Sequence, residues 1–292
     1  MNIDTRHLPW LDRAGRLSHL KLAAFVGVLL PLLWMATEYS AGGLRPNPIT
    51  EAIHQSGTWA VRLLLLSLAV TPLRRIGQWG KLIAVRRMIG VAAFGYAALH
   101  LTLYVADQHF DVARVAVEIL SRAYLTIGVL ALLGLAILAA TSTDGMIRRI
   151  GGKRWQALHK CVYVIGALAL FHFMLQAKLD VTQPVLMTGL FLILMGWRAL
   201  QKRGLGDSVP ALVALAAASS VGTALLESTW YHVQNHLAVP DVLRANLSVD
   251  DGLRPAVWVL LVGIGAGVLR AGCVIAKARS NLAPRVRVRV AS

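Results

Sequence analysis

Two histidines lie inside apolar segments of the sequence, where their side chains could bind a metal ion. His100 follows Arg87 by thirteen residues in one segment, and His172 follows His159 by thirteen residues in another. If both segments are helices that begin at the same side of a membrane, thirteen residues advance each helix by about 20 Å. We therefore expect His100 and His172 at matching depth, near the outer side of the membrane.

This pair favours one kind of metal centre. Two imidazoles at one depth on two helices of a bundle can hold an iron porphyrin between them. Most other metals need a third or fourth ligand, and no Asp, Glu or Cys accompanies the pair. A lone buried histidine can also be an ordinary hydrogen-bonding residue, but a matched pair indicates a haem with no open coordination position, suited to electron transfer. The surrounding side chains include aromatic residues, namely Phe94, Tyr96, Tyr104, Phe171 and Phe173.

His159 is harder to place. In a regular helix thirteen residues leave it about 140° away from the face of His172, so both cannot point into one site unless the helix is distorted near His159. The residues expected at its depth on the neighbouring helix are Arg86 and Arg87, where a second haem would need another histidine. This arginine pair could neutralise haem propionates, a flavin phosphate or a quinone headgroup, or be ordinary positive charge at the inner side.

Three further candidates lie near the outer end of the apolar segment 56–73. His54 is expected just before this helix, where it could cap a haem, contact a partner or be exposed. Arg62 could pair with a haem propionate or an acidic side chain, and Trp59 could line the outer haem site. The remaining histidines are expected to be solvated: His7, His19, His109, His232 and His236.

The composition predicts the elements that must position these residues. Hydrophobic residues make up 57% of the 292 residues, charged residues only 15%, and the mean hydropathy is +0.61. These values indicate an all-α, polytopic membrane protein. The eight expected spans are 20–38, 56–73, 88–106, 123–141, 157–178, 184–200, 209–230 and 255–275.

The distribution of charge predicts the orientation of the chain. With both termini in the cytoplasm, 23 of the 30 basic residues fall in inner segments, which is the positive-inside pattern. The net charge of +16 therefore does not indicate nucleic-acid binding, since no connecting segment is long enough to form a folded basic module. Membrane lipid is the expected surrounding.

The short connecting segments also limit the reactions that the chain can catalyse. Those after the second, fourth and sixth spans are too short for a nucleotide-binding domain, which needs a unit of about 30 residues. The chain therefore has no complete catalytic site of its own in this interpretation and must obtain electrons from another component. We expect a haem-binding core of six helices over residues 1–203.

Residues 204–292 are expected to form an accessory hairpin of two helices with a basic cytoplasmic tail. Its helices are rich in small residues and carry no titratable group at their centres. Gly263 and Gly267 have the GxxxG spacing that is typical of close helix packing.

Three stretches together resemble a known family: NPITEAIHQSGTWAVRLLLLSLAVTPLRR, RRMIGVAAFGYAALHLTLY, and SRAYLTIGVLALLGLAILAATSTDGMIRRIGGKRWQALHKCVYVIGALALFHF. In order and spacing they are similar to the haem-binding membrane subunits of the bacterial periplasmic methionine sulfoxide reductase system, the MsrQ/YedZ family of the ferric-reductase-like transmembrane superfamily. The resemblance covers roughly residues 20–203, and the C-terminal hairpin exceeds the usual six-helix core.

The resemblance implies a b-type haem protein of the inner membrane that also uses FMN. Electrons would come from the quinone pool or from a cytosolic flavin reductase. They would pass to a periplasmic molybdopterin-containing catalytic subunit that repairs methionine sulfoxide in oxidised envelope proteins. The haem histidines of the family carry over to His100, His159 and His172, and its basic pair carries over to Arg86 and Arg87.

Two other classes of function compete with this interpretation. A histidine-based proton or metal transporter would need acidic partners at membrane depth and broken helices at equivalent midplane positions, and neither is evident in the sequence. A purely structural assembly factor would bind no haem at all.

Overall fold

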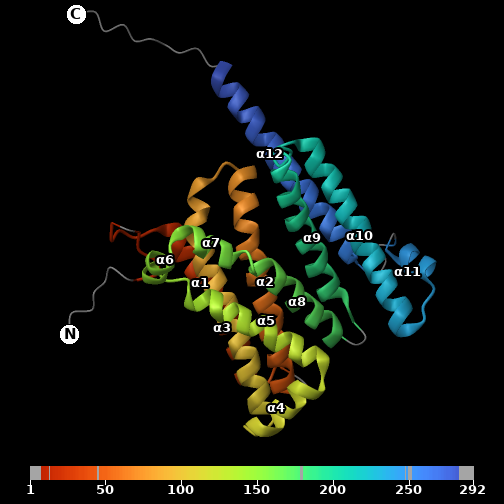
Figure 1. Ribbon diagram of the computed structural model, residues 1–292. Helices are drawn as coiled ribbons and strands as arrows, with labels where there is room; N and C mark the ends of the chain where they lie inside the picture. The colour runs from red at the N-terminus through yellow and green to blue at the C-terminus, as the bar shows by residue number, and fades with distance from the viewer. Residues whose placement is uncertain are drawn as a thin grey trace, which may run out of the picture. The chain divides into compact units, whose positions relative to one another are not determined.

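The computed structural model describes residues 8–12, 14–44, 46–177, 180–246, 248 and 252–282, and their architecture is all helical (Figure 1). Eight helices in this part of the chain are long and apolar enough to cross a membrane, which confirms the predicted multi-pass fold. Several basic residues of the orientation argument, and His7, lie outside the described residues: Arg6, Arg13, Arg45, Lys178, Arg285, Arg287 and Arg289.

The spans follow the apolar segments of the sequence closely. They are α1 (His19–Ser40), α2 (Pro48–Ile76), α3 (Ile83–Asp107, preceded by the short 3₁₀ turn η2, Gly80–Leu82), α5 (Ala123–Ala140), the pair α7 (Gly152–His159) and α8 (Val162–Gln176), α9 (Thr182–Lys202), α10 (Val209–Asn235) and α12 (Pro255–Leu282). Three short helices that the sequence did not predict lie in the connections: α4 (Val112–Ser121), α6 (Asp144–Ile150) and α11 (Val239–Ala245).

Two expected helix boundaries need correction. α2 begins at Pro48, so His54 lies inside the helix and not just before it. The early start has a local reason, because Pro at the first helical position is pre-organised for helix formation. The expected helix 157–178 is interrupted at residues 160–161, which separate α7 from α8. His159 is therefore the last residue of α7.

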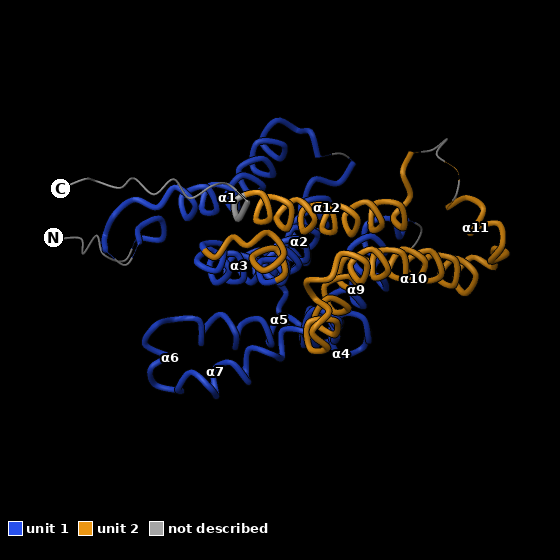
Figure 2. Tube along the Cα trace, turned by 90° about the horizontal axis from the view of Figure 1, so that it is seen from above, with its two compact units in different colours: residues 1–71, 81–188 blue, residues 72–80, 189–292 orange. Residues whose placement is uncertain are grey.

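The chain divides into two compact units, coloured separately in Figure 2. Unit 1 comprises residues 1–71 and 81–188, and unit 2 comprises residues 72–80 and 189–292. Most of α9 thus belongs with α10 and α12.

Unit 1 is built around α2, which is the most buried of the spans. The apolar core joins five spans through residues such as Val28 of α1, Leu64 of α2, Ala93 of α3, Leu135 of α5 and Ile165 of α8. Within this unit α5 packs against α8, α3 and α4. α4 adjoins the first turn of α5, and α6 and α7 follow its last turn (Figure 1).

Unit 2 is held together by close approaches at glycines. A Cβ atom added at Gly263 of α12 would lie 2.4 Å from the Cβ of Ala216 in α10. One added at Gly189 of α9 would lie 2.3 Å from Oγ1 of Thr223 in α10. Only a residue without a side chain permits such contact, so the expected packing role of Gly263 is confirmed.

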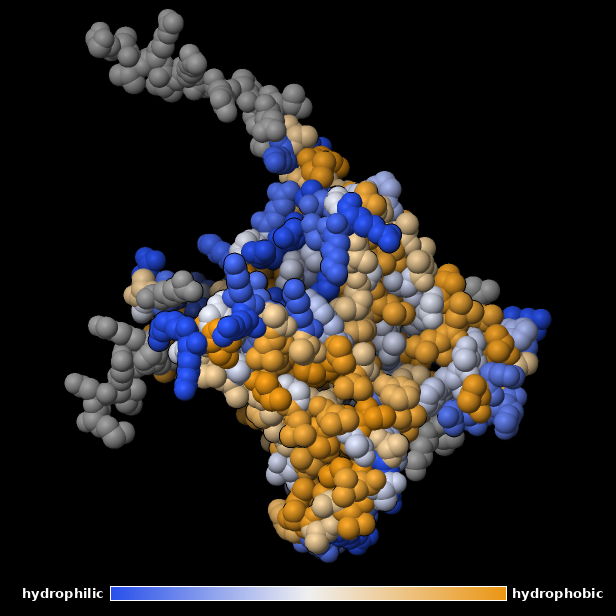
Figure 3. Space-filling model, in the orientation of Figure 1, coloured by the Kyte–Doolittle hydropathy of each residue, from blue (hydrophilic) through white to orange (hydrophobic). Residues whose placement is uncertain are grey.

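The outer surface of the spans is apolar. Large side chains that face away from the protein include Leu33 at 60% exposure, Ile137 at 55% and Val164 at 64%. Apolar residues form large continuous areas of the face shown in Figure 3. Exposed apolar area of this extent is the signature of helices solvated by lipid acyl chains.

Candidate functional site

His100 of α3 and His172 of α8 come together inside unit 1. Their ring centres lie 6.3 Å apart and their ring planes are inclined by 79°. Both side chains are partly buried. Helices that are distant in sequence thus bring the two imidazoles next to one another, as the expectation of matching depth requires.

Each imidazole is oriented by a main-chain carbonyl. Nδ1 of His100 lies 2.8 Å from the carbonyl oxygen of Ile53 in α2, and Nδ1 of His172 lies 2.7 Å from that of Tyr124 in α5. A carbonyl oxygen can only accept, so Nδ1 donates its proton in both cases. Nε2 of each ring is left with its lone pair and has no hydrogen-bond partner among the described residues. This is the tautomer that binds metals through Nε2.

A glycine four residues after each of these carbonyls makes room for the ring. A Cβ added at Gly57 would lie 2.9 Å from Nδ1 of His100, and one added at Gly128 would lie 2.8 Å from Nδ1 of His172. In a helix, residue i+4 lies directly above the carbonyl of residue i. Any side chain there would displace the imidazole from its acceptor. The pairs Ile53/Gly57 and Tyr124/Gly128 thus form the same cradle twice.

The aromatic surroundings differ in part from the expectation. Tyr124, which the sequence analysis did not select, stacks near His172 with a centroid distance of 6.5 Å. Tyr96 is buried and donates to the Val28 carbonyl, and Tyr104 donates to Glu118 of α4. Phe171 is 51% exposed, so it belongs to the lipid-facing surface.

His159 has a different environment from the pair. Its Nδ1 donates to the carbonyl of Trp155, 3.0 Å away, and its Nε2 lies 3.3 Å from the hydroxyl of Ser142. The Trp155 indole stacks on the ring at a centroid distance of 3.9 Å and donates to the Thr141 carbonyl. The break between α7 and α8 supplies the helix distortion near His159 that the sequence analysis required.

The two arginines near the start of α3 take separate positions. Arg87 forms an ion pair with Asp144 at the start of α6, and both side chains are largely exposed. Arg86 is partly buried and lies within electrostatic range of His159. The structure therefore brings Arg86 and His159, but not a second histidine, to this end of unit 1 within the described residues.

His54, Trp59 and Arg62 line one cavity of about 260 Å³. The Arg62 guanidinium lies 4.8 Å from the centre of the Trp59 ring and donates to Oε1 of Gln183. The other residues that line the cavity, besides Gln183, are Trp34, Glu51, Gln55 and Thr58. Since successive helical residues are about 100° apart, this face of α2 is opposite the one that carries Ile53 and Gly57. Helix α2 therefore separates the cavity from His100.

The distance between the two imidazoles indicates which metal centre they can bind. Metal–imidazole bonds of about 2.0 Å on both sides of one ion, with about 1.2 Å from each Nε2 to its ring centre, require ring centres about 6.4 Å apart. The observed 6.3 Å matches this value. Two ligands complete an octahedron only when a planar group supplies the other four, as a porphyrin does.

Comparison with known proteins identifies a family model and several relatives that are similar to this chain. Residues 56–170 match the family model described as ferric reductase like transmembrane component. A protein of Rhodospirillum rubrum is 43% identical over 188 residues, which is 64% of this chain and 88% of that protein. A protein of Herminiimonas arsenicoxydans is 40% identical, over 66% of this chain and 92% of its own length. Both are called protein-methionine-sulfoxide reductase heme-binding subunit MsrQ.

The chain belongs to the MsrQ family. A further MsrQ, from Caulobacter vibrioides, is 41% identical over 59% of this chain and 83% of its own length. No solved structure matches the chain.

The segment that matches the ferric-reductase model contains Gly57, Tyr124 and Gly128 of this MsrQ family member, together with His100 and His159. It begins three residues after Ile53 and ends two residues before His172. The histidines were predictable because they stand out in apolar segments. Ile53, Gly57, Tyr124 and Gly128 were not, because a carbonyl and a glycine have no distinctive residue chemistry. Only the repeated four-residue spacing could have indicated them.

Proposed function

We propose that this protein is a membrane b-type haem electron-transfer subunit, in which His100 and His172 would hold the haem iron. The observation that carries the proposal is the 6.3 Å spacing of two imidazoles whose Nδ1 atoms are both engaged by carbonyls. When bound, the haem supplies reversible one-electron transfer. An iron held by both histidines would have no open position for oxygen or peroxide chemistry, which suits it to electron transfer.

The residues around the pair support this role by their physical properties. The Ile53 and Tyr124 carbonyls fix the tautomer and the orientation of the two rings, so the ligands need little rearrangement on binding or on a change of charge. Ala93 and Tyr96, on the same helix as His100, are buried in the apolar core of unit 1. Hydrogen bonds to Nδ1–H also raise the electron-donating strength of Nε2.

The test is a set of reduced-minus-oxidised visible spectra with pyridine haemochrome quantitation on detergent-purified protein. His100→Ala and His172→Ala should each abolish the low-spin b-type signal of the pair. His109→Ala, in the connection between α3 and α4, is the matched control and should retain it. A wild-type protein without haem after haem-replete expression, or retention of the full signal in both ligand variants, contradicts the proposal.

We place a second cofactor site at His159 with Arg86 or Arg87. The Trp155 ring, the partly buried Arg86 and the short distance from Ser142 to Nε2 give this region an aromatic surface, a positive charge and an imidazole. It could hold a second haem, FMN or a quinol. His159→Ala should remove part of the haem if the site holds haem, and should remove FMN alone if it holds flavin. Unchanged haem, FMN and quinol-dependent reduction in this variant would refute the site.

The cavity beside Trp59 is the alternative place for a cofactor or quinol in unit 1. It presents two indole rings, the His54 imidazole, the Glu51 carboxylate and the guanidinium of Arg62. A quinol ring can stack on indole while its hydroxyl groups bond to imidazole and carboxylate. Arg62→Gln and Trp59→Leu should then slow haem reduction by quinol without changing the haem spectrum.

The proposed path begins at the quinone pool or a cytosolic flavin reductase and ends at a periplasmic molybdopterin-containing methionine sulfoxide reductase. The chain would lie in the bacterial inner membrane with both termini in the cytoplasm, in agreement with its basic residues. Reconstitution in liposomes with quinol and the catalytic subunit tests the path. Sulfoxide-dependent reoxidation of the haem is expected, and a haem that the catalytic subunit leaves reduced excludes this acceptor.

A further inference from the structure

Unit 2 contains a buried carboxylate that the proposed electron path does not use. Glu227 lies in the spanning helix α10 and is 1% exposed. It follows Ser219 and Thr223 at helical spacing, so three polar side chains share one buried face. Glu227 was not among the residues predicted from the sequence. An acidic residue within a membrane span is costly and indicates a function.

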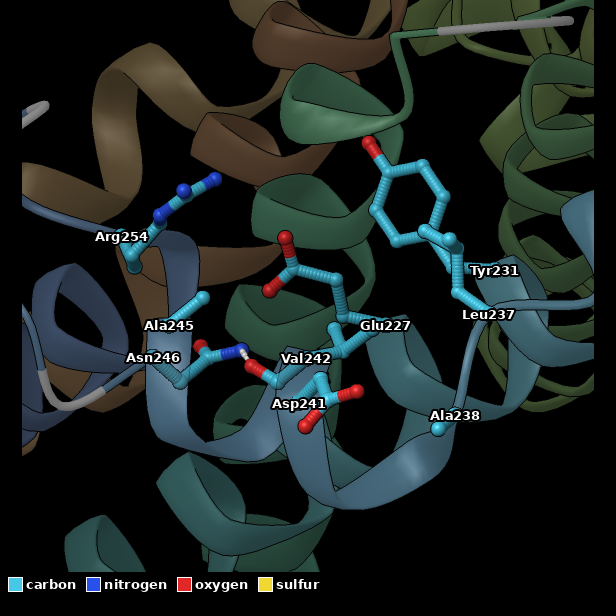
Figure 4. Close-up of a pocket in the computed structure, with 9 residues that line it drawn as sticks. All are labelled: Glu227, Tyr231, Leu237, Ala238, Asp241, Val242, Ala245, Asn246 and Arg254. Carbon is cyan, nitrogen blue, oxygen red and sulfur yellow. Dashed lines mark hydrogen bonds between the residues drawn. The ribbon is translucent and has the colours of Figure 1, made fainter.

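A cavity of about 300 Å³ lies against Glu227, at the end of α10 that leads to α11. This volume is at the lower limit of small-molecule sites, which span about 300–1,000 Å³. Figure 4 shows the Glu227 side chain at the centre of the lining residues, with Arg254 and Asn246 to one side and Tyr231 to the other. Asp241 of α11 contributes a second carboxylate to the lining.

Asn246 shows what the ligand must provide. The residue is 6% exposed and follows the last turn of α11. Its Nδ2 donates to the Val242 carbonyl at 3.1 Å, which fixes the other amide atom as the oxygen. Oδ1 is buried and accepts no hydrogen bond among the described residues. A buried acceptor without a donor is destabilising, so a group that brings N–H or O–H to this atom binds favourably.

The charges around the cavity narrow the class of ligand. Glu227, Asp241 and Asn246 line the cavity with acceptor oxygens. Glu227 is buried, and Asp241 is paired with Arg244 at 3.0 Å. A primary ammonium group carries three N–H donors and a positive charge, so it satisfies this set. Arg254 lines the same cavity just before α12 and presents positive charge to an anionic group. A ligand with both charges matches the cavity better than a simple cation.

We propose that this cavity binds a compact zwitterion whose ammonium group meets Glu227 and Asn246 and whose anionic group meets Arg254. The phosphoethanolamine headgroup has this chemistry, and it can arrive as part of a membrane phospholipid or as a soluble ester. The site goes beyond the proposed electron transfer, because all of its residues belong to unit 2 and none belongs to the haem region.

The test measures lipid retention on the full chain by native mass spectrometry after delipidation. The probes are phosphatidylethanolamine, phosphatidylcholine and phosphatidylglycerol with identical acyl chains. Phosphatidylcholine keeps the positive charge but has no N–H donor, and phosphatidylglycerol has no ammonium group. Wild-type protein should retain phosphatidylethanolamine about tenfold better than either of the others, because hydrogen bonds to charged groups are the strong ones.

Two variants locate the binding. Glu227→Gln removes the charge with little change of shape, and Asn246→Leu removes the acceptor; each should lower phosphatidylethanolamine retention about tenfold. Asp207→Asn removes an acidic residue at the other end of unit 2, where Asp207 faces Arg270, and should leave retention unchanged. Size-exclusion profiles and thermal melting show which variants are folded. If Glu227→Gln does not fold, Asn246→Leu still decides the question.

Competition separates the two sources of the headgroup. Soluble glycerophosphoethanolamine should displace bound phosphatidylethanolamine if the headgroup itself is recognised. Binding of the soluble ester to lipid-free protein, lost in Glu227→Gln, would support the site with a soluble source. Equal retention of the three lipids, or retention that neither variant changes, would mean that the cavity holds only water and would overturn the proposal.

Discussion

Substitution of Gly128 by alanine tests whether the glycine cradle positions His172. The new Cβ would lie 2.8 Å from both Nδ1 and Cε1 of the imidazole, whereas ordinary van der Waals contact begins near 3.4 Å. The ring must therefore move away from α5 by the difference, about 0.6 Å. That movement lengthens the Nδ1 to Tyr124 oxygen distance from 2.7 Å to beyond the usual hydrogen-bond range of about 2.7–3.2 Å.

The expected loss of haem affinity in Gly128→Ala follows from the energy of overpacking. Overpacking of a close contact typically costs about 1–3 kcal/mol, and a coupling of this size corresponds to roughly 5- to 150-fold in affinity. Gly128→Ala should therefore weaken haem binding within that range. The measurement is haem titration of the apo protein, with the pyridine haemochrome as the readout of occupancy.

Two matched glycines in unit 1 separate this effect from general damage. A Cβ at Gly134, also in α5, would lie 2.7 Å from Ile165 of α8, so Gly134→Ala produces a similar clash without touching a histidine. At Gly95 of α3 nothing lies within 4 Å of the added Cβ. Gly134→Ala should lower the melting temperature but retain haem affinity, and Gly95→Ala should change neither. Haem affinity in Gly128→Ala equal to wild type, or an equal loss in Gly134→Ala, would refute the reasoning.

Two further predictions concern other parts of the chain. Gly189→Ala would bring a Cβ within 2.3 Å of the Thr223 hydroxyl and should lower the unfolding free energy of unit 2 by about 1–3 kcal/mol, as measured by thermal melting, whereas Gly265→Ala meets nothing within 4 Å and should be neutral. The hydrogen bond from Tyr104, and then the nearby arginines, lower the pKa of Glu118. The Glu118 carboxylate therefore stabilises the docking of α4 fully above about pH 4.3, the ordinary pKa of glutamate. This stabilisation is lost as the pH falls through the lowered pKa of the folded state. Hydrogen–deuterium exchange of α4, corrected for intrinsic rates, should show this acid-side loss in wild type and not in Glu118→Gln.

The spans were predictable because lipid imposes a strong length and hydropathy requirement on each helix. The short helices were not, because α4 and α6 lie in charged connections that resemble ordinary loops. The break between α7 and α8 was also hidden, since the local sequence LHKCV contains neither Gly nor Pro. His54 was placed outside α2 because the apolar segment begins several residues after the helix does.

The histidine site was predictable to a similar extent. The fixed rise per residue of a helix predicted that His100 and His172 lie at the same depth on their two helices. The partners of their Nδ1 atoms depend on which helices lie beside α3 and α8, and that information is long-range. Glu227 was overlooked for a related reason, since only α11 and Arg254 turn its surroundings into a cavity.

The steep angle between the two imidazole planes has a spectroscopic consequence. Main-chain carbonyls fix both rings, so their 79° inclination cannot relax by free rotation about the bonds to a metal. If the two rings hold a haem iron between them at this inclination, the oxidised protein should give a strongly anisotropic low-spin electron paramagnetic resonance signal, which parallel rings would not produce.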